Sequence, residues 1–351
     1  MELGSEFNLD LADLKISPDN IWTYLEDYTS VLGFDSGRSA IKHISVSLKP
    51  ASSVMLPEFI CESVIRSFDG HPITFYRLNT DFTVDTEDLS KKITSGCAVF
   101  LMHYFGAVQP SSILQRVLDL CAARNCLIIE DTTHSIISKP STIGDYQVCS
   151  IRKWLPIPGG GVLYSKEDRL GIMKASHPVS ENNERTYGMI LKDLFLKGKL
   201  DCNQEYRGIF AFCEEQLDRQ EEIYQISDLA RFISSCFSVN EIRKRRITNY
   251  RILQSKLKEP GIFPALSLSD DQCPLSLPIH VSERDKLRQH LMENRIYCAV
   301  HWPFDGHCLE DRPFARKNAE HLLSLPIDQR YDEEHINYLA DVISRFGGAI
   351  V

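Results

Sequence analysis

The chain has 351 residues, of which 43% are hydrophobic and 25% charged, and its formal net charge is −9. The length is enough for about two domains, and the two fractions are those of an ordinary soluble protein. The acidic net charge argues against a nucleic acid or an acidic membrane as a partner. Every apolar run falls short of the ~20 residues that a membrane-spanning helix needs, so no membrane partner is expected.

The cysteine pattern indicates free thiols. Eleven cysteines are spread through a chain without a secretion signal, which favours buried thiols in a reducing cytoplasm over a disulfide framework. Cys121 with Cys126, and the loose cluster of His301, His307 and Cys308, lack the paired spacing of a structural zinc site. A cytoplasmic protein without a metal is therefore expected.

The first forty residues contain one candidate ligand site. Residues 1–7, M-E-L-G-S-E-F, resemble a vector-derived remnant and are expected to stand outside the fold. Residues 8–34 predict an entry segment with one helix at about 22–32. Ser36, Gly37, Arg38 and Ser39 then open an amphipathic run that extends to Leu48. Small polar residues at a helix start present backbone N–H groups to an anion, although a plain N-cap is the simpler reading.

From residue 54 onward, short apolar runs alternate with helical stretches. Strands are expected at 54–56, 74–76, 97–102, 127–129, 148–151 and 162–164, with helices at 58–68, 86–93 and 112–123. This alternation predicts an α/β domain with a mainly parallel sheet flanked by helices. Pro57, His103, Asp131 and Lys153 each follow a predicted strand, so they are expected to converge beyond the carboxyl ends of the sheet.

The second half of the chain predicts a helical insert and a small domain. Residues 166–260 are mostly helical in pattern, and 257–261 mark a break. Strands at 275–280 and 297–300 and helices at 282–293 and 332–346 then indicate a small α+β domain. The predicted organisation is a large cofactor-binding domain over 8–255, with a helical insert at about 166–255, and a small C-terminal domain over 256–351.

One stretch concentrates the reactive side chains. A predicted strand ends in Glu130-Asp131, and His134 lies three residues beyond; the next strand is followed by Ser150, Lys153 and a glycine-rich turn. The chain has no G-x-x-x-x-G-K-[ST] motif, which excludes a P-loop enzyme. The glycines at 159–161 precede a strand instead of a helix, which excludes a dinucleotide fold.

Pyridoxal phosphate fits this set of residues. It needs a lysine for a Schiff base, an acid against the pyridinium nitrogen, donors for the phosphate and a neighbour for the 3′-oxygen. Lys153, Asp131, the 36–39 helix start with Ser150, and His134 fill these roles in turn. Each also has an ordinary reading, since Asp131 could cap a turn and Lys153 could be a surface lysine.

These residues resemble the DegT/DnrJ/EryC1/StrS family of pyridoxal-phosphate-dependent sugar aminotransferases of fold type I. The matching features are the small-residue helix start at 36–40, the strand-proline Leu56-Pro57, the turn His103-Tyr104-Phe105-Gly106, the E-D-x-x-H motif at 130–134, the serine-lysine-glycine stretch from Ser150 to Gly161, and Leu325-Pro326-Ile327-Asp328.

Three features depart from the family pattern. The spacing from Ser150 to Lys153 is shorter than usual. The position that often stacks an aromatic ring on the cofactor holds Cys61, with Phe59 two residues earlier, and 175–235 lack a clear G-x-N-x-R match.

The resemblance implies transfer of an amino group from glutamate to a keto-sugar, usually nucleotide-linked, in bacterial surface polysaccharide or amino-sugar biosynthesis. It also implies a homodimer. Substrate contacts are expected from His103 and Tyr104, and from His301 and Trp302 in the small domain. His103 could instead only hold its turn, and the His301-Trp302 pair could be a packed interface.

Three alternatives remain open. The chain could be a pyridoxal-phosphate-dependent sugar dehydratase, although its retained Lys153 favours transamination, or an aminotransferase for a smaller keto-polyol phosphate. It could also be a non-catalytic cofactor- or sugar-binding protein on the same scaffold, a reading supported by Cys61 and the divergent 175–235.

Overall fold

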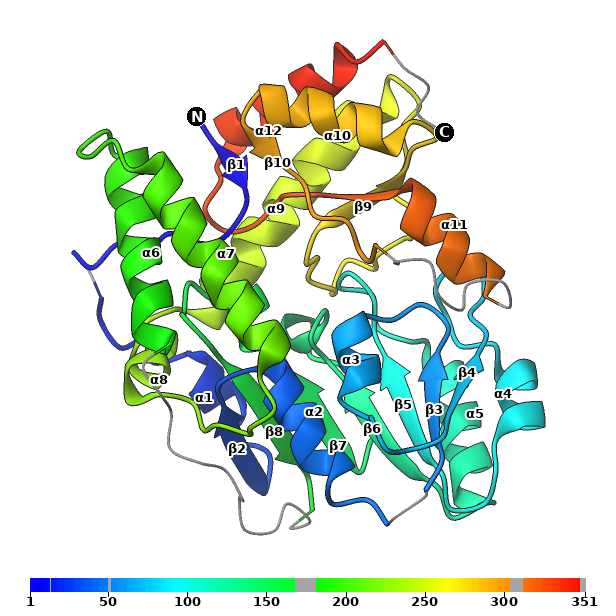
Figure 1. The fold of residues 1–351 in the computed structure, drawn as a ribbon. Coiled ribbons are helices and arrows are strands. Elements are labelled where there is room, and N and C mark those ends of the chain that lie inside the picture. The colour runs from blue at the N-terminus through cyan, green and yellow to red at the C-terminus, as the bar shows by residue number, and fades with distance from the viewer. Residues whose placement is uncertain (13, 50–51, 168–180, 304–311, 348–351) are drawn as a thin grey trace. The chain divides into compact units, whose positions relative to one another are not determined.

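The structure, a computed structural model, describes residues 1–12, 14–49, 52–167, 181–303 and 312–347 (Figure 1). It divides into two compact units, each formed by separate stretches of chain. The first unit contains Met1–Ser5, Lys49–Gly144 and Glu241–Val351, and the second contains Glu6–Leu48 and Asp145–Asn240. This division does not test the predicted boundary at 255/256, so the predicted domain limits stay predictions.

The first unit contains the parallel strands. Their order is β6-β5-β3-β4, and every neighbouring pair is parallel. The strands are β3 (Val54–Pro57), β4 (Ile73–Tyr76), β5 (Ala98–Met102) and β6 (Leu127–Asp131), and the helices between them are α3 (Glu62–Arg66), α4 (Thr86–Lys92) and α5 (Ser111–Ala122). All five residues of β5 are buried, as expected for a central strand covered on both faces. The predicted α/β class with a mainly parallel sheet is confirmed.

The later part of the first unit has a core of its own. Its elements are α9 (Val239–Lys258), β9 (Leu277–His280), α10 (Arg284–Glu293), β10 (Ile296–Tyr297), α11 (Pro313–His321), β11 (Leu322–Leu325) and α12 (Glu333–Ser344). β9 pairs with β11 in antiparallel register. One apolar cluster joins side chains from α9, α10, α12 and these strands. The predicted small C-terminal α+β part is therefore present, and its core begins in α9.

The first residues of the chain belong to this core. β1 (Leu3–Gly4) pairs in parallel with β10, and the Leu3 side chain is fully buried in the same apolar cluster. The Gly4 N–H donates a hydrogen bond of 2.6 Å to the Tyr331 hydroxyl. The expectation that residues 1–7 stand outside the fold is wrong, because the buried Leu3 and the pairing of β1 with β10 tie them to it.

The second unit contains antiparallel strands and the helical insert. β8 (Gly161–Ser165) lies between β2 (Ser30–Phe34) and β7 (Tyr146–Cys149), antiparallel to both. Its helices are α1 (Ile21–Tyr24), α2 (Gly37–Ser45), α6 (Glu181–Leu196), α7 (Asn203–Arg219) and α8 (Asp228–Ser235). It also contains the 3₁₀ turn η2 (Ile151–Lys153), whereas the 3₁₀ turn η1 (Ile136–Ser138) belongs to the first unit. α6 and α7 pack against each other as a helical pair (Figure 1). No helix in the described ranges is long and apolar enough to cross a membrane.

Candidate functional site

Glu130 and Asp131 end β6 and are both buried, but they have different partners. Glu130 Oε1 lies 2.8 Å from His103 Nε2, and its Oε2 accepts hydrogen bonds of 2.8 Å from the N–H groups of Ile143 and Gly144. A buried carboxylate is stable only when its oxygens are satisfied in this way. Glu130 therefore fastens the 143–144 turn to the end of β6.

The hydrogen bonds of His103 fix its tautomer. The Gln109 N–H donates to Nδ1 over 3.0 Å, so Nδ1 carries no hydrogen. Nε2 must then carry it and donate to Glu130 Oε1. The ring is fully buried with both nitrogens engaged, an arrangement that favours the reading in which His103 holds its turn.

Tyr104 is also engaged within the first unit. Its hydroxyl donates a 2.6 Å hydrogen bond to the Phe59 carbonyl, and burial raises the pKa of this hydroxyl well above 10, with Tyr76, Asp131 and Glu58 adding to the shift. The turn that follows requires glycine, because Gly106 has φ +108° and a Cβ there would lie 2.3 Å from the Cys273 carbonyl oxygen.

Asp131 and His134 form the part of the site that suits a pyridine ring. Asp131 Oδ1 accepts the Thr133 N–H over 2.8 Å, so one oxygen caps the turn after β6. His134 is fully buried, and its Nδ1 accepts the Phe105 N–H over 3.4 Å. The hydrogen of a neutral His134 therefore sits on Nε2, which makes that atom a donor suited to an anionic oxygen.

Aromatic rings surround His134. Trp302 stacks on it with ring centroids 5.7 Å apart and planes 19° apart, and His301 meets it edge-on at 5.4 Å. Trp302 also contacts Phe59, with centroids 4.9 Å apart, and is 8% exposed. Residues 301–302 are therefore packed against the E-D-x-x-H motif within the first unit. Cys61 is half-buried at the N-cap of α3, with its Sγ 3.1 Å from Ser63 Oγ.

In the second unit, the predicted phosphate cradle brings its parts together. The Ser36 side chain caps α2 by accepting the Ser39 N–H over 3.1 Å. A Cβ on Gly37 would lie 2.9 Å from Ser150 Cβ, and one on Gly161 would lie 2.1 Å from the Ser36 carbonyl oxygen. Only glycine permits such approaches. The helix start and Ser150 therefore lie side by side, as a shared anion site requires.

Lys153 is half-buried at the end of η2, and Arg152 before it is part of an ion-pair network. Arg152 and Arg185 both contact Glu6 and Glu214, with N–O distances between 2.7 and 3.4 Å. Burial lowers the pKa of Arg152, but the two carboxylates outweigh it and hold that pKa above its usual value. This network fixes η2, and with it the backbone that carries Lys153.

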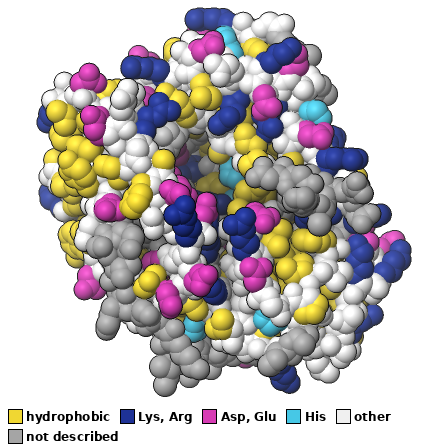
Figure 2. Space-filling view, viewed as in Figure 1, with side chains coloured by type: hydrophobic (Ala, Val, Ile, Leu, Met, Phe, Trp, Pro, Cys, Tyr) yellow, Lys and Arg dark blue, Asp and Glu magenta, His cyan; other side chains and the backbone are white. Residues whose placement is uncertain are grey.

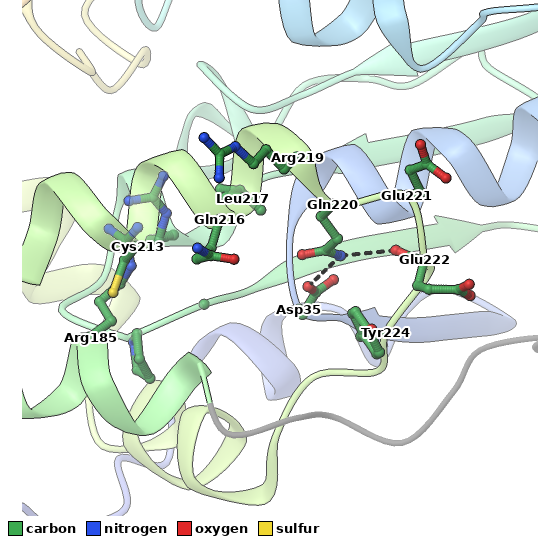
Figure 3. Close-up of a pocket in the computed structure, with 13 residues that line it drawn as sticks. Asp35, Arg185, Cys213, Gln216, Leu217, Arg219, Gln220, Glu221, Glu222 and Tyr224 are labelled. Atoms are coloured by element: carbon green, nitrogen blue, oxygen red, sulfur yellow. Dashed lines mark hydrogen bonds between the residues drawn. The ribbon is translucent and has the colours of Figure 1, made fainter.

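A polar cavity of about 260 Å³ lies in the second unit beside these features (Figure 3). Its lining includes Asp35, next to the helix start, and Arg152, next to Lys153. Gln220 Nε2 donates to Asp35 Oδ2 over 2.9 Å and to Ser39 Oγ over 3.2 Å. Burial raises the pKa of Asp35 above 3.8 against these hydrogen bonds. The cavity can therefore accept a small polar ligand between charged groups of both signs.

The site residues predicted from the sequence do not include Asp35, Arg152 or the two carboxylates that contact Arg152, Glu6 and Glu214. Asp35 precedes Ser36 and Arg152 precedes Lys153, and this adjacency to a predicted residue is the signal in the sequence that could have identified them. Glu6 and Glu214 come from distant segments, so no local pattern joins them to η2.

Among the described residues, no group of three or more His, Cys, Asp or Glu side chains could hold a metal ion. Cys121 and Cys126 lie within this range, whereas His307 and Cys308 lie outside the described residues.

Solved structures of sugar aminotransferases share this fold. The chain superposes on a putative sugar aminotransferase from Streptococcus pneumoniae in its PLP form with a TM-score of 0.66 and 15% identity, over 95% of this chain and 92% of that one. It matches DesV of S. venezuelae, solved with a ketimine intermediate, with a TM-score of 0.64 and 17% identity, over 92% and 85%.

A DegT DnrJ EryC1 StrS aminotransferase from Brucella abortus gives a TM-score of 0.64 at 14% identity, over 93% of this chain and 90% of that one. At these identities the likeness shows the fold, and it agrees with the resemblance read from the sequence motifs. No family model and no curated protein matches the sequence.

Proposed function

We propose that this protein is a pyridoxal-phosphate-dependent aminotransferase that moves an amino group from glutamate to a keto-sugar. The observation that carries the proposal is the pair at the end of β6. Asp131 supplies a buried carboxylate, and His134 supplies a ring whose Nδ1 already accepts a hydrogen bond, so that its Nε2 is the donor. These two groups match the pyridinium nitrogen and the 3′-oxygen of the cofactor.

The phosphate ligands are proposed from the second unit, considered by itself. Ser36, Gly37, Arg38, Ser39 and Ser150 are the proposed phosphate ligands, because a helix start with exposed amides and a neighbouring hydroxyl suits a phosphate dianion. The close approaches of Gly37 and Gly161 support this role. The Arg38 side chain is 31% exposed and forms an ion pair with Asp218 at 2.6 Å.

Bound pyridoxal phosphate would supply an electron sink that stabilises negative charge on the substrate's α-carbon. Lys153 Nζ is proposed to bind the cofactor covalently and, once released, to carry the proton to and from that carbon. Asp131 would keep the ring nitrogen protonated. The Arg152 ion pairs would hold the backbone of η2 in place during this exchange.

The acceptor is proposed to be a nucleotide-linked keto-sugar, in amino-sugar or bacterial surface polysaccharide biosynthesis in the cytoplasm. The names of the structural neighbours support the sugar class, since several are described as sugar aminotransferases. His103, Tyr104, His301 and Trp302 remain the proposed substrate-side residues; of these, Trp302 and His301 are the better placed because they pack on His134. Cys61 remains the proposed neighbour of the cofactor ring.

The active form is proposed to be a homodimer. Tyr187, Leu196 and Phe212, on α6 and α7, are exposed by 57%, 41% and 44%. Figure 2 shows apolar side chains gathered at the left edge of the view, and Figure 1, in the same view, shows α6 and α7 there. Exposed apolar patches of this kind favour association. Light scattering of the purified protein tests the proposal, and a monomer at micromolar concentration would contradict it.

The cofactor assignment is tested by titration and trapping. Addition of pyridoxal phosphate should produce a visible absorption band, and borohydride should then fix the cofactor on the peptide that contains Lys153. Lys153→Ala should abolish trapping, whereas Lys166→Ala, an exposed lysine of the same unit, should leave it unchanged. A protein that takes up no cofactor at micromolar levels, or a trapped peptide without Lys153, would overturn the assignment.

The reaction class is tested by a half-reaction. Glutamate alone should convert the bound cofactor to its amine form and release one 2-oxoglutarate per site. Screening of keto-sugar nucleotides and keto-polyol phosphates against the amine form then identifies the acceptor. Loss of water from a sugar without ketoacid release would instead favour the dehydratase, and binding without either reaction would favour a non-catalytic protein.

A further inference from the structure

Two cysteines face each other at the start of neighbouring strands. Cys97 immediately precedes β5 and Cys126 immediately precedes β6, and the Cys97 thiol donates to Cys126 Sγ with the sulfur atoms 3.4 Å apart. Both are free thiols. A disulfide needs a separation of about 2.05 Å, so each sulfur atom has to move by less than about 1 Å.

The backbone holds this pair in register. The Leu127 N–H donates to the Cys97 carbonyl over 3.0 Å, and the Gly96 N–H donates to the Arg124 carbonyl over 2.9 Å. Ala98 and Leu127, the residues that follow the two cysteines, are partners in the parallel ladder. Neighbouring parallel strands lie ~4.8 Å apart, which is inside the range of Cα separations that a disulfide spans.

The two thiols differ in access. Cys97 is 1% exposed, whereas Cys126 is half-buried. Burial, together with the neighbouring Cys126, raises the pKa of Cys97 to about 12, so its thiolate is scarce at neutral pH. Cys126 is the sulfur that a reagent in solvent reaches first, and Cys97 is the one behind it.

We propose that Cys97 and Cys126 form a reversible disulfide, and that low-molecular-weight disulfides such as oxidised glutathione are the oxidant. In the first step the Cys126 thiolate attacks oxidised glutathione, forms a mixed disulfide and releases one glutathione thiolate. In the second step Cys97 Sγ attacks Cys126 Sγ and expels the second glutathione, which takes the Cys97 proton. The two cysteines lose two electrons and two protons, and oxidised glutathione becomes two molecules of glutathione.

The bond would lie away from the candidate active site. Both cysteines are at the amino ends of their strands, while Asp131 is at the carboxyl end of β6. Asp131 is the fifth residue after Cys126 along the strand, which places it ~16 Å away at 3.3 Å per residue. The disulfide would close a loop of about thirty residues and lower the unfolding equilibrium constant by about two orders of magnitude. It is therefore a stabilising modification of the sheet, independent of the proposed transamination.

The test uses the native chain of 351 residues without added cofactor. The protein is incubated with oxidised glutathione, remaining thiols are alkylated, and peptides are mapped by mass spectrometry before and after dithiothreitol. The expected product is a Cys97–Cys126 linked peptide that is lost on reduction, with a higher midpoint of thermal unfolding for the oxidised protein.

Two variants and one internal control define the chemistry. Cys126→Ser should prevent the link, and Cys97→Ala should leave Cys126 as a stable glutathione adduct because the second thiol is missing. Cys236, a half-buried thiol that donates to a carbonyl of its own helix, should give only a mixed disulfide in the same sample. A wild-type protein in which Cys126 stops at the glutathione adduct, or one that links Cys97 only after denaturation, would overturn the proposal.

Discussion

Glu130 is the more constrained of the two carboxylates at the end of β6. It accepts three hydrogen bonds, one from the Nε2–H of His103 and two from backbone N–H groups. All three partners are donors. In either orientation of its amide, a glutamine would therefore place its NH₂ group against a donor and lose at least one hydrogen bond. We expect Glu130→Gln to lower the free energy of unfolding by about 2–3 kcal/mol. Glu62→Gln, in an exposed pair with Arg66, is the control and should change little.

Urea unfolding followed by circular dichroism measures both variants. Equal stability of Glu130→Gln and the wild type would show that the three hydrogen bonds are not required for the fold.

Asp131 should respond differently from its neighbour. Asparagine can keep the Oδ1 hydrogen bond to the Thr133 N–H, so the turn is preserved. The negative charge proposed to face the cofactor ring is lost. We expect Asp131→Asn to fold with near wild-type stability but to lower the rate of the glutamate half-reaction by at least about a hundredfold. Stopped-flow absorbance measures this rate, and a rate within twofold of the wild type would remove Asp131 from the proposed mechanism.

At the scale of elements, the contact of α2 with Ser150 is the feature most sensitive to side-chain size. A Cβ on Gly37 would approach Ser150 Cβ to 2.9 Å, whereas one on Gly208, within α7, would meet nothing within 4 Å. Gly37→Ala should therefore destabilise the protein by about 1–2 kcal/mol and weaken cofactor binding, because it separates the parts of the phosphate cradle. Gly208→Ala should stabilise by about 0.5–1 kcal/mol through helix propensity alone.

Thermal unfolding and a titration with pyridoxal phosphate distinguish these effects. Opposite signs of the two stability changes are expected. A Gly37→Ala variant that binds the cofactor as tightly as the wild type would argue against a phosphate site at this helix start.

Most elements between residues 54 and 165 follow the local pattern, because buried strands and amphipathic helices have distinct periods. The helix predicted at 22–32 is wrong beyond Tyr24. Residues 30–34 form β2 instead, since pairing with β8 overrides a helix-like spacing of apolar residues. The helix predicted at 58–68 begins only at Glu62, because the Glu58 N–H continues the ladder by donating to the Tyr76 carbonyl. Both errors come from tertiary pairing.

The short elements α11 and β11 were not predicted at all. Pro313 at the start of α11 was the available helix signal. β11 is defined by its pairing with β9, and this partner lies more than forty residues earlier in the chain.

At the scale of the whole molecule, each unit is assembled from segments far apart in the sequence, so local patterns could locate reactive residues but not their partners. His103 and Glu130 each belong to a motif in the sequence, but no sequence pattern predicts the hydrogen bond between them. The LPID stretch near the C-terminus shows the same limit. It was noted as a family signature, and the structure gives Asp328 a structural role: it is buried and forms a two-pronged ion pair with Arg330, at 2.8 and 2.9 Å.

The surroundings of Asp328 join α9 to the segment before α12. The buried Arg246, on α9, donates to the Gln329 side chain over 2.9 Å and to the Leu275 carbonyl over 2.7 Å. Asn249, one turn further along, donates to three backbone carbonyls between residues 327 and 331. This network connects the C-terminal core to the helix that enters it, so its stability bears on the whole first unit.

The acid stability of the protein should depend on this pair. Burial raises the pKa of Asp328, but the Arg330 guanidinium, its hydrogen bonds and Arg246 outweigh burial and hold that pKa below 3.8. A carboxyl whose pKa is lower in the folded state stabilises the fold above its unfolded pKa, and this contribution is lost as the pH falls through the folded value. Asp328 should therefore stabilise the protein at pH 5–7 and lose its effect below about pH 4.

Asp328→Asn tests this directly. At pH 7 the variant should be less stable by about 2 kcal/mol, since it leaves the half-buried Arg330 guanidinium without its carboxylate, and the difference from the wild type should shrink as the pH falls below about 4. Asp270→Asn is the matched control, because Asp270 also pairs with an arginine, Arg251, at 2.8 Å but is 97% exposed. It should leave both the stability and its pH dependence unchanged. Urea unfolding between pH 3 and 7 measures all three proteins, and a constant difference between Asp328→Asn and the wild type over this range would mean that the Asp328 carboxylate does not contribute through its charge.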